Sequence, residues 1–126
     1  MTPDKNLHPD RLAEVRLEIR NAVAYITFDH VAARNAMTVG MYQSLKFICE
    51  DLTKSSEVRV AILRGAGGKS FVSGSDIAQF EVFQNGDDGI RYEEDIDEYL
   101  TPLAMLPFPT IAVIDGMAVG GGLAIA

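Results

Sequence analysis

The chain has 126 residues, 48% hydrophobic and 23% charged, which fits one globular domain or part of a larger one rather than a disordered chain. Its net charge of -7 disfavours a nucleic-acid partner. The single cysteine, Cys49, excludes an internal disulfide framework and a cysteine-rich zinc site. Its neighbours Phe47 and Ile48 predict a thiol buried in the core, and a reducing, cytoplasmic compartment is expected.

Two strands are predicted near the start. Residues 1–13 are expected to form a flexible segment without a secretory signal. Polar and apolar residues alternate over 14–20, which predicts a half-buried strand. Its buried face would carry Val15, Leu17 and Ile19. After a turn at Asn21, residues 22–28 form a second strand and complete a hairpin, and a loop follows over 29–37.

A helix over residues 38–53 is predicted next, capped by Thr38. Its apolar stripe consists of Met41, Leu45, Ile48 and Leu52. The β-branched run at 58–63 predicts a short, well-covered strand, and the glycines at 65–68 predict a loop after it.

A second helix is expected over 89–105, with an apolar stripe opposite an acidic, solvated face. The stripe contains Tyr92, Ile96, Tyr99 and Leu103. Residues 110–114 form another strand. From residue 99 to residue 126 the only charge is Asp115, yet prolines and glycines interrupt the stretch too often for a membrane span, so we expect a buried core there. The alternation of strands and helices indicates an α/β layered fold.

The last residues predict a turn at 120–122 that begins an apolar helix, and the chain stops after about one turn of it. We therefore expect the chain to be a fragment of a longer protein. The 126 residues alone are expected to be inactive.

Three familiar site motifs do not fit. Residues 65–70 lack the glycine spacing and the following helix of a phosphate-binding loop. Ser75 lacks the second glycine of a hydrolase nucleophile elbow. The acids at 87–88 and 93–95 lack the pattern of a calcium loop, and no metal site is predicted.

Two turns rich in small residues remain, at 71–77 and 115–122. Each follows a strand, and the second opens a helix; in the first, Asp76 can begin a helix that runs through Phe80. Backbone N–H groups at two such turns, directed at one point, would stabilise a developing oxyanion. Two purely structural glycine turns are the alternative that the residues leave open.

Three segments together resemble the crotonase superfamily (enoyl-CoA hydratase/isomerase), in order and spacing, over about residues 15–126. They are FDHVAARNAM at 28–37, GAGxxSFVSGSDI at 65–77 and PTIAVIDGMAVGGGL at 109–123. The resemblance implies the N-terminal half of a spiral of ββα repeats, a homotrimer or hexamer, and an acyl-CoA substrate. Coenzyme A belongs to that substrate, so no separate cofactor is expected.

The resemblance also implies a site. The backbone N–H groups of Ser75 and Gly121 would form the oxyanion hole, with serine standing where alanine is usual. The remaining substrate-binding residues would come from the loop after the second strand and from the two turns. They are Ala33, Arg34, Ala36, Gly74, Asp76, Ile77, Ala78 and Gly120.

The chain departs from the family pattern at two positions. Ala124 occupies the place of one of the two glutamates of the hydratases, and Ala78 replaces a lysine, although Arg34 could still supply a charge for the CoA phosphates. The alanine at position 124 therefore favours isomerases or other acyl-CoA lyases that use a different base. A non-catalytic acyl-CoA-binding or scaffold member is the alternative function.

Overall fold

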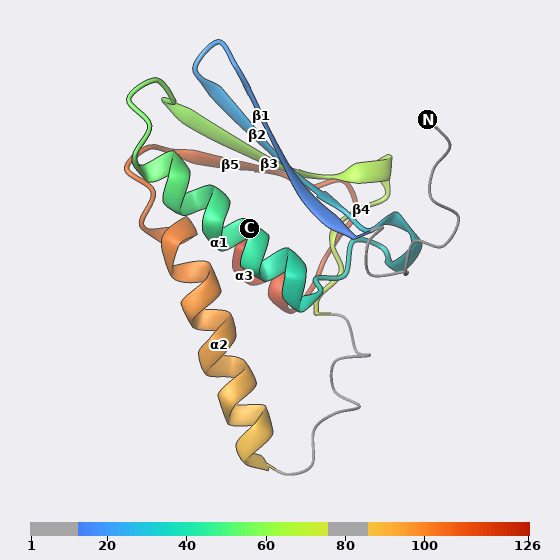
Figure 1. Ribbon diagram of the computed structural model, residues 1–126. Helices are drawn as coiled ribbons and strands as arrows, with labels where there is room; N and C mark the ends of the chain where they lie inside the picture. Colours follow the sequence, from blue (N-terminus) through green and yellow to red (C-terminus); the bar gives the residue numbers. More distant parts are fainter. Residues whose placement is uncertain (1–12, 76–85) are drawn as a thin grey trace, which may run out of the picture.

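Residues 13–75 and 86–126 are described by the computed structural model of the chain (Figure 1). The predicted segment 1–13 lies outside them except for Ala13, as does the predicted helix from Asp76 to Phe80. Within the described part, no helix combines the length and apolar character needed to cross a bilayer.

The helices and strands follow one another as three ββα units (Figure 1). The first unit contains β1 (Glu14–Arg20), β2 (Val23–Asp29) and α1 (Val39–Thr53), the second β3 (Val60–Gly65), β4 (Ser70–Val72) and α2 (Gly86–Ala104), and the third β5 (Thr110–Val113), β6 (Met117–Ala118) and α3 (Gly121–Ile125). In the part of the chain that the structure describes, short 3-10 turns at Val31–Ala33 and Ala66–Gly68 lie in the connections. The predicted α/β fold is confirmed.

A mixed sheet with the order β1-β2-β3-β5 forms the main layer. β1 and β2 are antiparallel, whereas β3 and β5 each join in parallel. Asn21 and Ala22 form the hairpin turn with φ of 51° and 69°, so the second strand begins at Val23 rather than at the predicted residue 22. The third strand is likewise displaced, from the predicted 58–63 to Val60–Gly65.

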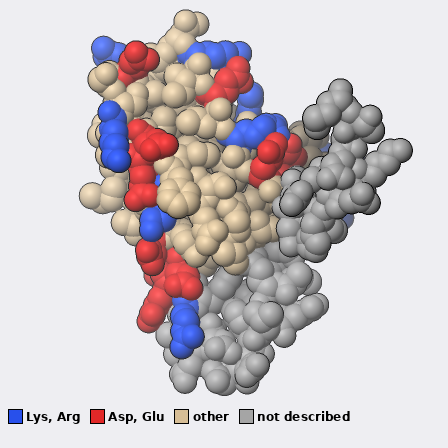
Figure 2. Space-filling view, in the orientation of Figure 1, with Lys and Arg blue, Asp and Glu red and all other residues tan. Residues whose placement is uncertain are grey.

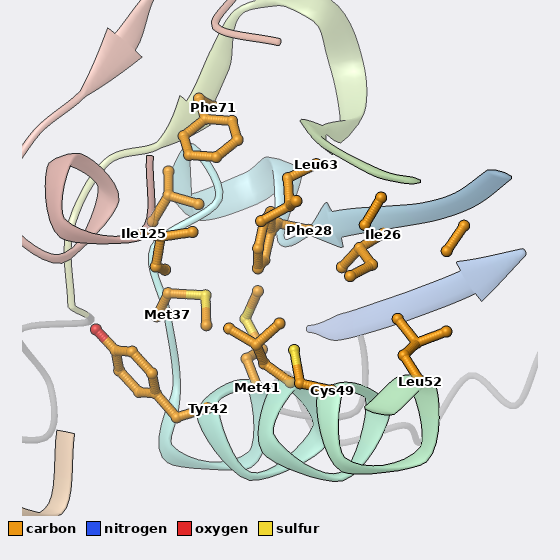
Figure 3. Packing of buried hydrophobic residues seen from close by; sticks show 14 of the residues in the cluster. Ile26, Phe28, Met37, Met41, Tyr42, Cys49, Leu52, Leu63, Phe71 and Ile125 are labelled. Atoms are coloured by element: carbon orange, nitrogen blue, oxygen red, sulfur yellow. The ribbon is translucent and has the colours of Figure 1, made fainter. Parts of the chain in front are cut away.

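The predicted first helix is confirmed as α1, where the Thr38 hydroxyl accepts a 3.1 Å hydrogen bond from the Met41 amide. Its inner face packs on the sheet (Figure 3). Cys49 is fully buried there, as predicted. Phe47 does not join the core and is 65% exposed. It lies two residues before Cys49, and residues two positions apart on a helix point to nearly opposite faces.

The edge strand β1 is less buried than its alternation predicts. Val15 packs against the core, but Leu17 and Ile19 are exposed. In the hairpin register these two side chains share a face with Ile26 and Ala24, which are fully buried. A central strand has neighbours on both sides, whereas an edge strand has only one, so the same pattern buries less surface in β1.

The second helix, α2, begins at Gly86 instead of the predicted residue 89 and packs beside α1. Ile96, Tyr99 and Leu103 of the predicted stripe are half-buried against the core. The side chain of Tyr92, the fourth member of the stripe, lies outside the described part. The acidic face is solvated, as predicted, and Figure 2 shows acidic side chains along α2. Its exposed acids include Glu94, Asp95, Asp97 and Glu98.

The apolar stretch at the C-terminal end is not the buried core that its sequence predicts. Ile111 is 52% exposed and Val113 41%, and both pair with β3 in the register that turns them away from buried Leu63. α1 covers the Leu63 side of the sheet. No helix of the described residues covers the other side of the sheet. The apolar side chains of β5 that point to that side therefore stay exposed.

Candidate functional site

The short parallel pair of β4 and β6 brings the two small-residue turns together. Ser70 pairs with Met117 and Val72 with Ala118, and the Val119 amide donates to the Val72 carbonyl over 3.2 Å. Parallel strands end at the same edge, so the chain leaves both strands side by side. The two turns, distant in the sequence, are therefore neighbours in space.

Backbone contacts fix the first turn at Gly74. The Met37 amide donates to the Gly74 carbonyl over 2.8 Å, and Met37 pairs with Ser75 as an isolated parallel bridge. Gly74 has a φ of 123°, a backbone conformation that other residues rarely adopt. The turn thus delivers Ser75 half-buried and tied to the segment that precedes α1.

Gly121, the first residue of α3, faces Ser75 across the gap between the turns. A methyl group built on Gly121 would lie 3.9 Å from the Ser75 amide nitrogen and 3.6 Å from Ser75 Oγ. The same methyl would lie 2.6 Å from the Tyr42 hydroxyl, so only glycine fits without a shift. The structure therefore brings together the two residues that the sequence analysis singled out for their amides.

Buried Asn35 organises the loop between β2 and α1. Its side-chain amide donates to the carbonyls of Ala66 and Ser70 over 3.0 and 2.9 Å, and its Oδ1 accepts from the His30 amide over 2.8 Å. These bonds tie the loop to the start of β4 with no charged group.

The substrate-binding residues predicted in this loop lie against β4. Ser73 and Ser70 donate their hydroxyls to the carbonyls of Ala33 and Arg34, over 3.3 and 2.9 Å. Ala36 is buried, and its carbonyl lies 2.7 Å from the Nδ1 of His30. The predicted loop is thus joined to the strand that leads to Ser75.

A cavity of about 450 Å³ lies beside the start of β4 and β6. Arg34 and Lys69 give its lining two positive charges, and Val31 and Met117 give it apolar surface. The remaining lining residues are Asn35, Ala66, Gly67 and Ser70. Lys69 belongs to the segment 65–70 that does not fit a phosphate-binding loop, yet a lysine after a glycine turn by itself suggests an anion-binding site.

Tyr42 was missed as a site residue. It lies on α1, is fully buried, and its hydroxyl is 2.8 Å from Ser75 Oγ. Its ring stacks on that of Tyr99 of α2, with centroids 6.1 Å apart. Tyr42 falls outside the predicted apolar stripe of its helix, and nothing local in the sequence marks its contact with a residue 33 positions away.

The other predicted site residues divide into two groups. Gly120 precedes α3 with a φ of 55°, and Ala124 is exposed on that helix. Asp76, Ile77 and Ala78 lie outside the described residues. Among residues 13–75 and 86–126, no group of three or more His, Cys, Asp or Glu side chains is arranged to hold a metal ion.

Comparison with known proteins identifies the family. The model of the enoyl-CoA hydratase/isomerase family matches residues 18–126. The chain belongs to this family. The resemblance inferred from the three sequence segments is confirmed, and it covers nearly the range that the segments predicted.

Relatives within the enoyl-CoA hydratase/isomerase family are longer than this chain. The chain is 34% identical over 115 residues to the short-chain-enoyl-CoA hydratase of Clostridium acetobutylicum. This alignment covers 91% of the chain and 44% of that relative. It is 37% identical over 112 residues to the (E)-benzylidenesuccinyl-CoA hydratase of Thauera aromatica, with 89% of the chain and 43% of the relative covered. The chain therefore spans less than half the length of these curated relatives.

Solved structures of the family share the fold. The crystal structure of an enoyl-CoA hydratase/carnithine racemase from Magnetospirillum magneticum matches with a TM-score of 0.84 and 33% identity, over 89% of this chain and 42% of that one. The described residues thus adopt the fold of the N-terminal region of an enoyl-CoA hydratase/isomerase.

Proposed function

We propose that the protein binds an acyl-CoA thioester and holds the thioester oxygen between the backbone N–H groups of Ser75 and Gly121. One observation carries this proposal: the turn after β4 and the turn after β6 meet, so that a methyl group built on Gly121 would lie 3.9 Å from the Ser75 amide nitrogen. Family membership supports the substrate class, because the relatives matched include CoA-ester hydratases by name.

Two amide donors at this point favour a specific chemistry. When a thioester loses an α-proton or gains a nucleophile at the β-carbon, negative charge moves onto the carbonyl oxygen. A fixed donor directed at that oxygen contributes about 3 kcal/mol to the transition state, more than it contributes to the uncharged carbonyl. The pair therefore supports reactions that pass through an enolate, such as hydration or double-bond isomerisation.

The CoA portion would follow the loop at 33–36 and the residues around Gly74 and Gly120, continuing over Asp76, Ile77 and Ala78. We place an anionic part of CoA at the cavity that holds Arg34 and Lys69, because two cations beside an apolar wall suit a nucleotide phosphate. This adds Lys69 to the residues proposed from the sequence.

Proton transfer needs a base as well as the two amides. Ala124 stands where the family resemblance places a hydratase glutamate, so a base from elsewhere would be needed for turnover. The same alanine favours a second candidate function, a non-catalytic acyl-CoA-binding or scaffold protein. We also expect residues 14–126 to be the N-terminal part of a core domain that assembles as a homotrimer or hexamer.

The binding proposal is tested with butanoyl-CoA labelled with ¹³C at its carbonyl. We expect the infrared carbonyl band of the bound ligand to lie at lower frequency than that of the free ligand, because two hydrogen bonds weaken the C=O bond. Calorimetry should show weaker binding of S-butyl-CoA, a thioether that lacks the oxygen. Equal affinities together with an unshifted carbonyl band would contradict the oxyanion hole.

The two candidate functions differ in turnover. Crotonyl-CoA is incubated with a protein that contains this chain and has the full length of its family relatives. The loss of crotonyl-CoA is followed by absorbance. Hydration or isomerisation supports an enzyme. Binding with a shifted carbonyl band, but without loss of any acyl-CoA tested, supports the non-catalytic candidate.

A further inference from the structure

The Tyr42 hydroxyl lies where the two turns of the proposed oxyanion hole meet. It is 2.8 Å from Ser75 Oγ and would be 2.6 Å from a methyl group on Gly121. One oxygen atom therefore lies at hydrogen-bond distance from Ser75 and fills the space beside Gly121, and these are the two residues whose amides the proposed function uses. Neither of those contacts involves the amides themselves.

We propose that Tyr42 is a positioning residue that sets the separation and orientation of the Ser75 and Gly121 amides. The inference rests on the proposed function. It also gives the Ser75 side chain a role in this chain, whereas an oxyanion hole needs only the amide of that residue.

Chemistry favours one direction for the hydrogen bond. A phenol is a stronger acid than an aliphatic alcohol, so the stronger arrangement has the Tyr42 hydroxyl donating to Ser75 Oγ. This bond adds a side-chain anchor to a turn that the Met37 amide already holds by the Gly74 carbonyl. Ser75 is then fixed on both sides, and rotation about its backbone would break one anchor or the other.

Two helices contact the Tyr42 ring or carry it. Its ring belongs to the buried cluster on α1 and stacks on Tyr99 of α2 with an interplanar angle of 14°. Figure 3 shows the ring reaching from α1 with its hydroxyl at the edge of the apolar cluster. Because α1 and α2 hold the ring from two sides, the hydroxyl is a fixed point against which the turns can be placed.

The test compares Tyr42→Phe and Ser75→Ala with the unsubstituted protein, using ¹³C-labelled butanoyl-CoA. In each variant we expect the bound carbonyl band to move part of the way back to the free-ligand frequency, and binding to weaken about fivefold, which corresponds to one hydrogen bond. The double variant should behave like Tyr42→Phe, because that substitution already removes the hydroxyl contact that Ser75→Ala removes.

Tyr99→Phe is the matched control. It removes a hydroxyl from the stacked partner ring, keeps the stacking, and should leave the carbonyl band unchanged. Thermal unfolding of each variant confirms that it is folded, and Ser75→Ala, at a half-buried position, keeps the test valid if Tyr42→Phe unfolds.

The outcomes separate the two proposals. An unshifted carbonyl in the unsubstituted protein contradicts the proposed function and this inference with it. A carbonyl band that is shifted in the unsubstituted protein, and equally shifted in folded Tyr42→Phe or Ser75→Ala, contradicts this inference alone. Additive changes in the double variant also contradict it, because they would mean that the two hydroxyls act independently.

Discussion

β2 and β5 are both apolar strands of one sheet, yet their side chains meet different surroundings. In β2, Ile26 and Phe28 are fully buried beneath α1. In β5, Ile111 and Val113 keep about half of their surface exposed. An apolar run therefore predicts that a strand forms, whereas burial depends on whether another layer covers the face to which each side chain points.

The comparison also shows where the C-terminal segment does pack. Met117 and Val119 are exposed, but Gly121 lies beside Tyr42 and Ser75, and Ile125 belongs to the buried cluster. The segment from β5 to α3 is thus held to the rest of the molecule by strand pairing and by close contacts around the proposed site.

Matched isoleucine substitutions should reveal the largest difference. Ile26→Ala leaves a cavity in the core and should lower the free energy of unfolding by about 2–5 kcal/mol. Ile111→Ala, at a position 52% exposed, should lower it by about 0.5 kcal/mol. Urea unfolding of both variants measures the difference. Equal losses would mean that the exposed face of β5 is covered in solution, for example by a second copy of the chain.

Gly121→Ala should have an intermediate effect and sharpen the comparison within the C-terminal segment. Its methyl group would lie 2.6 Å from the Tyr42 hydroxyl, so we expect a loss of about 1–3 kcal/mol from overpacking. The next nearest atoms belong to Ser75, at 3.6 and 3.9 Å, so Tyr42→Phe removes the clash. Gly121→Ala should therefore destabilise the Tyr42→Phe variant less than the unsubstituted protein, as measured by thermal unfolding. An equal loss in both backgrounds argues that the hydroxyl is not where the structure places it.

The smallest expected effect concerns Cys49 in the well-covered region. Burial raises the pKa of its thiol from 9.0 to about 12, so the folded state keeps the thiol neutral while the unfolded state ionises it above pH 9. The unfolded state then binds fewer protons, and stability falls as pH rises between these two values, by at most about 1.4 kcal/mol per pH unit. Cys49→Ala lacks this group, so its stability should fall less steeply from pH 8 to pH 10.5 in urea titrations. Parallel curves for the two proteins would show that the thiol does not contribute.

Local patterns in the sequence predicted most of the secondary structure. The strand at 14–20, the Thr38 cap and the stripe of α1 were each predicted from neighbouring residues, and the structure has all three. Burial in β1 and β5 was predicted wrongly because it depends on which elements cover a face, and no single strand encodes that. Phe47 was misplaced for a related reason, since adjacent residues on a helix point in different directions.

The candidate site was predicted as residues but not as a set of contacts. The glycine turns around Ser75 and Gly121 were recognisable from small residues after strands and from the family resemblance. Tyr42 and Lys69 were not assigned to it, because their contacts with the site or cavity come from the tertiary structure. A buried tyrosine on an amphipathic helix resembles any other core residue until its hydroxyl is placed.

The parallel pairing of β4 with β6 has a consequence for folding. Ser70 and Met117 are 47 positions apart, so the pair forms only after a long loop has closed. The proposed hole cannot exist in a partly assembled chain that lacks this pairing. Occupancy by a CoA thioester and cooperative unfolding should therefore be linked, and the melting temperature should rise with ligand concentration.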